Sequence, residues 1–254
     1  MPRIILPPVR RSLLLLLALL LALLGLSACG SKSQSSSSNT SSSAATPPPP
    51  PPPPTPATKP TAGKTAQGCR KISAPAPKGQ QHLAKPTLKL DPAKTYELVV
   101  DTNCGSFTIR LDPKRNPKTS ASLYYLAKRG FFDGLTFHRV SAGFVIQGGD
   151  PLGDGSGGPG YTVVEPPPRS ARYPRGTIAM AKTQSEPPGA SGSQFFVVTA
   201  ADATSTLGGQ YAIGGQVVKG QGVVQRIGSI PTSPPQDGPP VDAVVMSKVT
   251  AKVR

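Results

Sequence analysis

Several residue types that build metal centres and reactive sites are scarce in this chain of 254 residues. It has no tryptophan, three cysteines and two histidines, and no Cys-x-x-Cys pair or run of carboxylates occurs. This composition offers no recognisable set of metal ligands, so neither a metal nor another cofactor is expected. The segment SGSQ at 191–194 lacks the spacing of a nucleophile elbow, and the Gly-rich residues 150–160 lack the ending of a phosphate-binding loop.

Acidic residues are absent from the first 90 positions. These positions carry 11 Lys/Arg, whereas residues 91–254 carry 17 Lys/Arg and all 12 Asp/Glu, a net charge of +5. Most of the overall charge of +16 therefore comes from a segment without a periodic apolar pattern. This distribution favours a solvated basic tether, able to contact an anionic lipid surface or wall polymer, over a nucleic-acid-binding fold.

No apolar run reaches the roughly 20 residues that a membrane-spanning helix needs. The run Leu13–Leu24 has 12 residues, and Arg3, Arg10 and Arg11 precede it. A basic start, a short apolar run and small residues after it are typical of a cleaved signal peptide. We therefore predict a signal peptide at residues 1–28 and exclude it from the fold.

The end of this segment, LSAC at 26–29 followed by Gly30, resembles the lipobox of bacterial lipoproteins. The resemblance implies that Cys29 becomes the lipidated first residue of the mature protein. Acyl chains such as palmitate would then anchor the exported protein to the outer face of the bacterial cytoplasmic membrane. An ordinary secretory signal with an incidental cysteine is the alternative.

Residues 29–90 are predicted to form a disordered tether. Ser, Thr and Ala dominate residues 31–46, and Pro47–Pro54 is an unbroken run of eight prolines expected to adopt polyproline II. A recognition motif for an adaptor domain is the alternative for this run. Two cysteines remain after Cys29, and disulfides persist in exported proteins, so we predict a Cys69–Cys104 bridge. Two free thiols are the alternative.

A folded domain is expected at residues 91–254, where the apolar pattern predicts short strands and two helices. The predicted strands are 96–100, 106–111, 135–140, 144–147, 177–181, 194–199, 211–218 and 243–249, and the predicted helices are 117–129 and about 222–227. Asn116 is the expected N-cap of the first helix, and Gly130 its left-handed end. These elements describe a mainly β fold, a closed eight-stranded antiparallel β-barrel capped by two helices.

Two blocks within this domain carry the most specific signal. Residues 137–150 read FHRVSAGFVIQGGD, and residues 191–198 read SGSQFFVV. In this order and spacing they resemble the signature segments of the cyclophilins, the β-barrel peptidyl-prolyl cis-trans isomerases. The resemblance covers about residues 93–254 and implies both the barrel and the isomerase activity.

The resemblance also implies a site in which Arg139 donates to the prolyl nitrogen, with Phe144 and Gln147 beside it. The implied substrate-binding residues are Val145, Ala181, Lys182, Gln194, Phe196, Leu207 and Tyr211, next to the loop 155–158. Without the resemblance, the residues themselves favour ordinary barrel core for Phe144 and Phe196. His138 is interpreted as structural, because strand alternation points it away from Arg139.

The chain departs from the family pattern at several positions. Thr206 stands where many cyclophilins carry Trp, Val145 replaces a common Met, Lys182 a common Asn, and Gly214 a common Phe, a loss expected to loosen the pocket. We predict a monomeric isomerase that acts on proline-containing unfolded or exported polypeptides at the cell surface. A degenerate groove that binds proline segments without catalysis, as a chaperone or scaffold, is the alternative.

Overall fold

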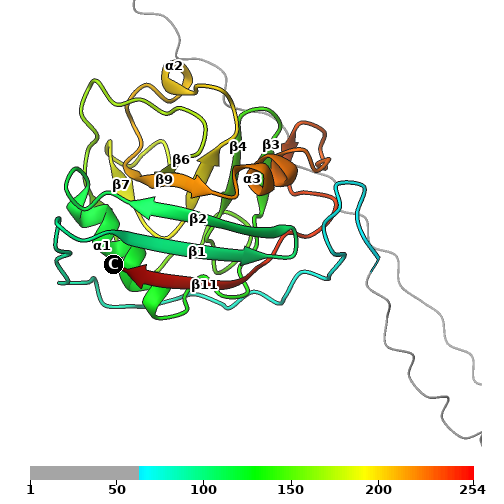
Figure 1. Cartoon of the computed structure of the whole chain (residues 1–254), viewed down its shortest axis with the longest axis horizontal. Helices are drawn as coiled ribbons and strands as arrows, with labels where there is room; N and C mark the ends of the chain where they lie inside the picture. The colour runs from blue at the N-terminus through cyan, green and yellow to red at the C-terminus, as the bar shows by residue number, and fades with distance from the viewer. Residues whose placement is uncertain (1–62) are drawn as a thin grey trace, which may run out of the picture. The chain divides into compact units, whose positions relative to one another are not determined.

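The computed structural model describes residues 63–254; the predicted signal peptide, Cys29 and the proline run lie outside the described residues. Within 63–254, nine antiparallel strands form one curled sheet in the order β10-β3-β4-β8-β6-β9-β2-β1-β11, and β5 pairs with β7 separately. Figure 1 shows helices α1 and α3 at different ends of this curled sheet. The strands are β1 Tyr96–Thr102, β2 Gly105–Leu111, β3 Arg139–Ser141, β4 Val145–Gly148, β5 Val163–Val164, β6 Thr177–Met180, β7 Ala190–Ser191, β8 Phe195–Val198, β9 Ile213–Lys219, β10 Asp237–Gly238 and β11 Met246–Val253. The helices are α1 Pro117–Lys128, α2 Thr204–Leu207 and α3 Gln221–Gly228.

The mainly β fold is confirmed, but the element count differs from the eight strands and two helices expected. In the described part of the chain the main sheet gains the two-residue strand β10, and α2 adds a single helical turn. The strand expected from residue 135 begins only at Arg139. The residues before it instead join the two ends of the sheet: Thr136 forms an isolated bridge with Val245, and Phe137 N–H donates to the Val244 carbonyl at 2.9 Å.

The main apolar core fills the inside of the curl. Alternate strand residues such as Val140, Ile146 and Val197 are fully buried there. The Phe137 ring meets Phe195 edge-to-face, with ring centroids 6.1 Å apart. The helices close the core by the residues on their inner faces: Leu123 and Leu126 of α1, and Val224 and Ile227 of α3. Burial of these side chains is the main favourable contribution to folding.

Helix α1 begins where the sequence predicts but is capped by a distant residue. Asn116 occupies the N-cap position, yet its side chain makes no capping hydrogen bond. Glu165 instead accepts from the backbone N–H groups of Lys118 (2.9 Å) and Thr119 (2.8 Å). A carboxylate at this end also complements the helix dipole. The expected left-handed residue after the helix is present, since Gly130 has a φ of 66°.

Residues 63–90, here called the N-terminal strap, run along the barrel, although their composition assigns them to the tether. Lys78 N–H donates to the Pro151 carbonyl and Leu83 N–H to the Pro159 carbonyl, both at 2.8 Å. Leu83 also packs against the main core. The predicted boundary at residue 90 therefore does not match the structure. Backbone hydrogen bonds to loops and the packing of Leu83 hold the strap on the folded domain.

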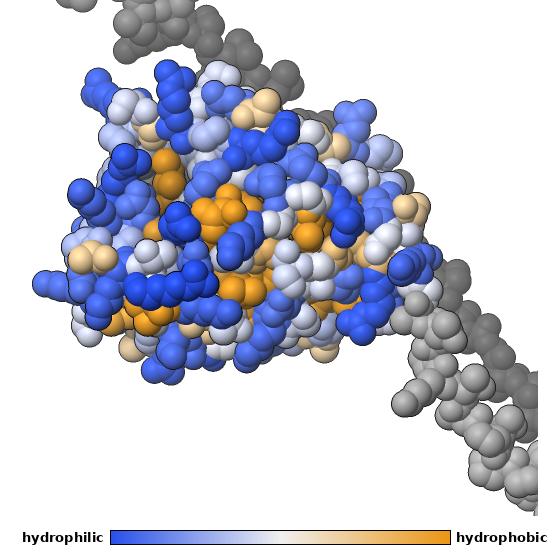
Figure 2. Space-filling model, viewed as in Figure 1, coloured by the Kyte–Doolittle hydropathy of each residue, from blue (hydrophilic) through white to orange (hydrophobic). Residues whose placement is uncertain are grey.

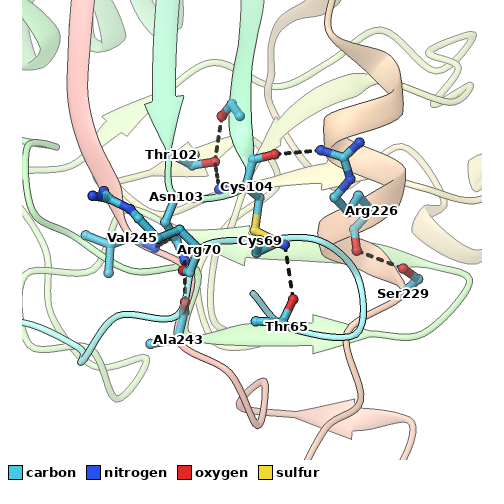
Figure 3. The surroundings of a disulfide bond; sticks show 11 residues. Thr65, Cys69, Arg70, Thr102, Asn103, Cys104, Arg226, Ser229, Ala243 and Val245 are labelled. Atoms are coloured by element: carbon cyan, nitrogen blue, oxygen red, sulfur yellow. Dashed lines mark hydrogen bonds between the residues drawn. A yellow bond between two sulfur atoms is a disulfide. The ribbon is translucent and has the colours of Figure 1, made fainter. Parts of the chain in front are cut away.

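A disulfide attaches the strap to the turn between β1 and β2 (Figure 3). Cys69 and Cys104 are both buried, and the Asn103 side chain holds the same junction. Its amide donates to the Arg70 carbonyl at 2.8 Å, and its oxygen accepts from the Val245 N–H at 2.9 Å. The strap is thus bound to the barrel covalently at one point and by hydrogen bonds around it.

On the face that Figure 2 shows, apolar residues form separate patches among hydrophilic ones. No helix in residues 63–254 has the length and apolar character needed to cross a membrane. The same residues contain no group of three or more His, Cys, Asp and Glu side chains placed to hold a metal ion.

Replacing Cys69→Ser together with Cys104→Ser should lower the free energy of unfolding by about 3–4 kcal/mol, because a cross-link over this length of chain restricts the unfolded state. Urea unfolding of the full chain measures the change. Cys29→Ser is the matched control and should leave the unfolding midpoint in place. Two alkylatable thiols at positions 69 and 104 in the native, unreduced protein would contradict the prediction.

Candidate active site

One row of cross-strand partners brings the predicted site residues together. Arg139 on β3 lies opposite Gln147 on β4, which lies opposite Phe196 on β8. Phe196 in turn lies opposite Ala179 on β6. The intervening residues, such as Ile146, belong to the main core. Because side chains alternate along a strand, the row faces the outside of the curled sheet.

The Arg139 guanidinium is held on two sides. Its Nε and Nη2 donate to the two carboxylate oxygens of Asp237, both at 2.7 Å, and its Nη1 donates to Gln147 Oε1 at 3.1 Å. Such a two-bond fork fixes the orientation of the planar guanidinium as well as its position. The two side chains are 36% and 50% exposed, so the pair adds little to stability, and its main effect is to orient Arg139.

Asp237 is a site residue that the sequence analysis missed. It lies on β10 opposite Ser141, whose hydroxyl also donates to it at 3.1 Å. The hydrogen bonds from Arg139 keep the pKa of Asp237 below its usual range, so the carboxylate is ionised. The preceding residue, Gln236, has a φ of 73°, an unfavourable backbone conformation retained next to a functional group. Nothing in the local sequence links this aspartate to an arginine 98 positions earlier.

Two of the five N–H donors of Arg139 are left for a ligand. Asp237 takes the Nε donor and one on Nη2, and Gln147 takes one on Nη1. The guanidinium is planar and cannot lose its charge at ordinary pH. The remaining donors are one on each terminal nitrogen.

An apolar cluster lies on the same outer face, separate from the main core although the same strands build it. Among the predicted residues, Val145, Phe196 and Leu207 are buried in this cluster, and Phe144, Ala181 and Tyr211 are half-buried around it. The Phe196 and Tyr211 rings meet edge-to-face with centroids 5.4 Å apart. The half-buried side chains of Phe144 and Tyr211 offer a surface on which a small apolar ring can pack.

A chain of amides connects Arg139 to the glycine-rich loop. Gln147 Nε2 donates to Gln194 Oε1 at 3.1 Å, and Gln194 Nε2 donates to the carbonyls of Gly155 and Gly157, both at 2.8 Å. Gln147 and Gln194 also line a pocket of about 690 Å³ next to this row. Two of the other predicted residues, Ala181 and Lys182, lie in its wall.

Comparison with known proteins agrees with this arrangement. Residues 97–251 match the family described as "Cyclophilin type peptidyl-prolyl cis-trans isomerase/CLD". The chain belongs to this family. It is 40% identical over 176 residues to peptidyl-prolyl cis-trans isomerase B of Streptomyces anulatus, covering 62% of this chain and 97% of the relative. It is also 40% identical over 140 residues to peptidyl-prolyl cis-trans isomerase-like 1 of Rhizopus delemar, covering 54% and 82%.

Solved cyclophilin structures share the fold. The crystal structure of a Cryptosporidium parvum cyclophilin type peptidyl-prolyl cis-trans isomerase has a TM-score of 0.57 at 26% identity, covering 62% of this chain and 98% of its own. A second structure of that protein, in the presence of the dipeptide Ala-Pro, has a TM-score of 0.56 at 27% identity and covers 61% and 98%.

In this cyclophilin the surroundings of Gly214 and Lys182 differ from what the sequence suggests. Gly214 was expected near the pocket floor, but a side chain there would enter the main core, with its Cβ 2.6 Å from Leu123 Cδ1. The expectation that Gly214 loosens the substrate pocket is therefore wrong. Lys182 is partly engaged already, since its Nζ donates to the carbonyls of Thr183 and Glu186, both at 3.1 Å.

His138 lies next to Arg139 but takes no part in the polar network. Both of its ring nitrogens are enclosed without a hydrogen-bond partner among the described residues. Burial lowers the pKa of His138, against an opposing effect of Asp150, so the imidazole stays neutral beside the guanidinium. This placement agrees with a structural role.

Asp237→Asn should lower kcat/KM for a proline-containing peptide about tenfold, because an amide cannot accept from both Nε and Nη2 and the guanidinium loses its orientation. Asp242→Asn is the control with the same loss of charge. In an Arg139→Ala background the Asp237 change should have no further effect, as a double-mutant cycle would show. Additive losses in that cycle would contradict the positioning role.

Proposed function

We propose that this cyclophilin catalyses cis–trans isomerisation of X–Pro bonds in exported, proline-containing polypeptides. We further propose that a lipid on Cys29 anchors the protein to the outer face of the bacterial cytoplasmic membrane. The observation that carries the catalytic part is the placement of two unused Arg139 donors beside the apolar cluster around Phe196 and Tyr211. The export and the anchor rest on the sequence before residue 31.

Rotation about an X–Pro bond meets a barrier of roughly 18–20 kcal/mol, because amide resonance is lost in the twisted state. The reaction needs no nucleophile or proton transfer. In the twisted state the lone pair localises on the prolyl nitrogen, and a fixed cationic donor stabilises it more than it stabilises the planar amide. A hydrogen bond from a charged group contributes about 1.5–3 kcal/mol, or roughly 10- to 100-fold in rate.

The apolar cluster supplies the second requirement, a fixed proline ring. If the ring packs against Phe144, Phe196 and Tyr211, the flanking carbonyl can turn while the nitrogen stays near Arg139. The Cryptosporidium parvum relative crystallised in the presence of Ala-Pro supports a proline-containing ligand for this groove. Thr206, exposed next to the buried Leu207, leaves one side of the groove without the aromatic group of many family members.

Arg139→Ala should reduce kcat/KM in a protease-coupled assay of an Ala-Pro peptide by about 10- to 100-fold. Arg139→Lys should recover little of this loss, because an ammonium group cannot form the fork to Asp237. Arg115→Ala removes an exposed arginine whose salt bridge is to Asp112, and it is the control. If isomerisation is no faster with wild type than with Arg139→Ala or without protein, and Ala-Pro peptides are still bound, the result would favour the non-catalytic binding module instead.

The anchor is tested separately. In a bacterial host fed labelled palmitate, the wild-type chain should carry label and sediment with membranes, and Cys29→Ser should lose both properties. Ser33→Ala should keep them. An unmodified Cys29 in the purified mature protein would contradict the proposal.

A further inference from the structure

One tyrosine lies inside the apolar cluster of the active site and takes no part in the polar network around Arg139. Tyr173 is fully buried in this cluster. The same cluster contains Phe144, Phe196 and Tyr211, against which the prolyl ring is proposed to pack. A fully buried side chain cannot touch a bound substrate, so any effect of Tyr173 on the reaction must act through its neighbours.

The Tyr173 side chain holds the backbone of Tyr211, a residue outside any strand or helix. The Tyr173 hydroxyl donates to the Tyr211 carbonyl at 2.7 Å, and no other residue in 63–254 donates to that oxygen. Burial raises the pKa of Tyr173, so the hydroxyl keeps its proton and remains a donor. The carbonyls of Gln210 and Ala212 accept from backbone N–H groups of other segments, at 2.9 and 2.8 Å. Of these three successive carbonyls, that of Tyr211 is therefore the one held by a side chain.

The backbone of Tyr173 holds a second wall of the cluster. Its N–H donates to Thr204 Oγ1 at 2.9 Å, and its carbonyl accepts from the Ala203 N–H at 3.0 Å. These contacts lie at the start of α2, which contributes the buried Leu207 to the cluster. Thr206 on the same helix is exposed, so α2 adds no aromatic ring. Tyr173 therefore joins α2 to the segment that its hydroxyl holds.

We propose that Tyr173 is a positioning residue for the prolyl ring, because its hydroxyl fixes Tyr211, whose ring meets Phe196 edge-to-face. The inference rests on the isomerase function proposed above, and Tyr173 itself touches no reacting atom. The apolar atoms of a prolyl ring change little between the planar and the twisted amide, so contacts with them stabilise both states about equally. Loss of this positioning should therefore raise KM and leave kcat nearly unchanged.

The test uses Tyr173→Phe in the full chain, which removes the hydroxyl and keeps the ring. We expect KM for an Ala-Pro peptide to rise about fivefold and kcat to change by less than about twofold. Tyr96→Phe is the matched control and should leave KM at the wild-type value, because the buried Tyr96 hydroxyl accepts from the Asp91 N–H in the main core. In a Tyr211→Ala background, Tyr173→Phe should not change KM further, although it should lower the free energy of unfolding in both backgrounds.

An unchanged KM in Tyr173→Phe, or the same rise in KM in the Tyr211→Ala background, would overturn the inference. If the wild-type chain proves inactive on the peptide, the proposed catalysis fails, and the Kd of the same peptide measured by calorimetry takes the place of KM. A Kd about fivefold higher in Tyr173→Phe and unchanged in Tyr96→Phe would then still support the positioning role. Equal Kd values in the three proteins, or no binding by the wild type, would overturn it.

Discussion

The orientation of one guanidinium depends on a carboxylate that comes from the far end of the domain. A half-exposed arginine on a strand can adopt many rotamers, and ordering it costs up to about 2 kcal/mol of side-chain entropy. Asp237 and Gln147 order Arg139 in the free protein, so that this cost does not fall on substrate binding or on the twisted state. The short strand β10 has little other role in the sheet, since it pairs with β3 at only two positions. The loop that carries it is therefore best understood as support for the active site.

The same strands build two apolar clusters with different roles. Residues on the inner face, such as Ile146 and Val197, fill the main core, whereas their neighbours Val145 and Phe196 lie in the cluster on the outer face. An apolar cluster outside the core marks a binding surface when polar groups border it. Here the border is formed by Arg139, Gln147 and Gln194, and their hydrogen bonds continue to the glycine-rich loop. Ligand selectivity and fold stability thus depend on opposite faces of one sheet.

The N-terminal strap changes how the charge of the molecule is distributed. Six of the eleven basic residues that precede residue 91 lie in the strap: Lys64, Arg70, Lys71, Lys78, Lys85 and Lys89. They belong to the surface of the folded part, because the disulfide and the backbone bonds of Lys78 and Leu83 hold the strap there. The folded part is therefore more basic than the composition of residues 91–254 suggests.

The sequence by itself determined eight of the strands, the bounds of α1 and α3 to within a few residues, and the family, because these depend on alternation, turn residues and two local blocks. It also identified Arg139, Gln147 and Phe196, since they lie in those blocks, and the structure brings them into one cross-strand row. Only the tertiary structure decided that Asp237 orients Arg139, that Glu165 caps α1, that Gly214 faces the core, and that Tyr173 donates to the Tyr211 carbonyl. Each of these depends on segments far apart in the chain coming together. A local sequence pattern cannot predict such contacts. It indicates which face of a strand or helix a residue occupies, but not which distant segment packs against that face.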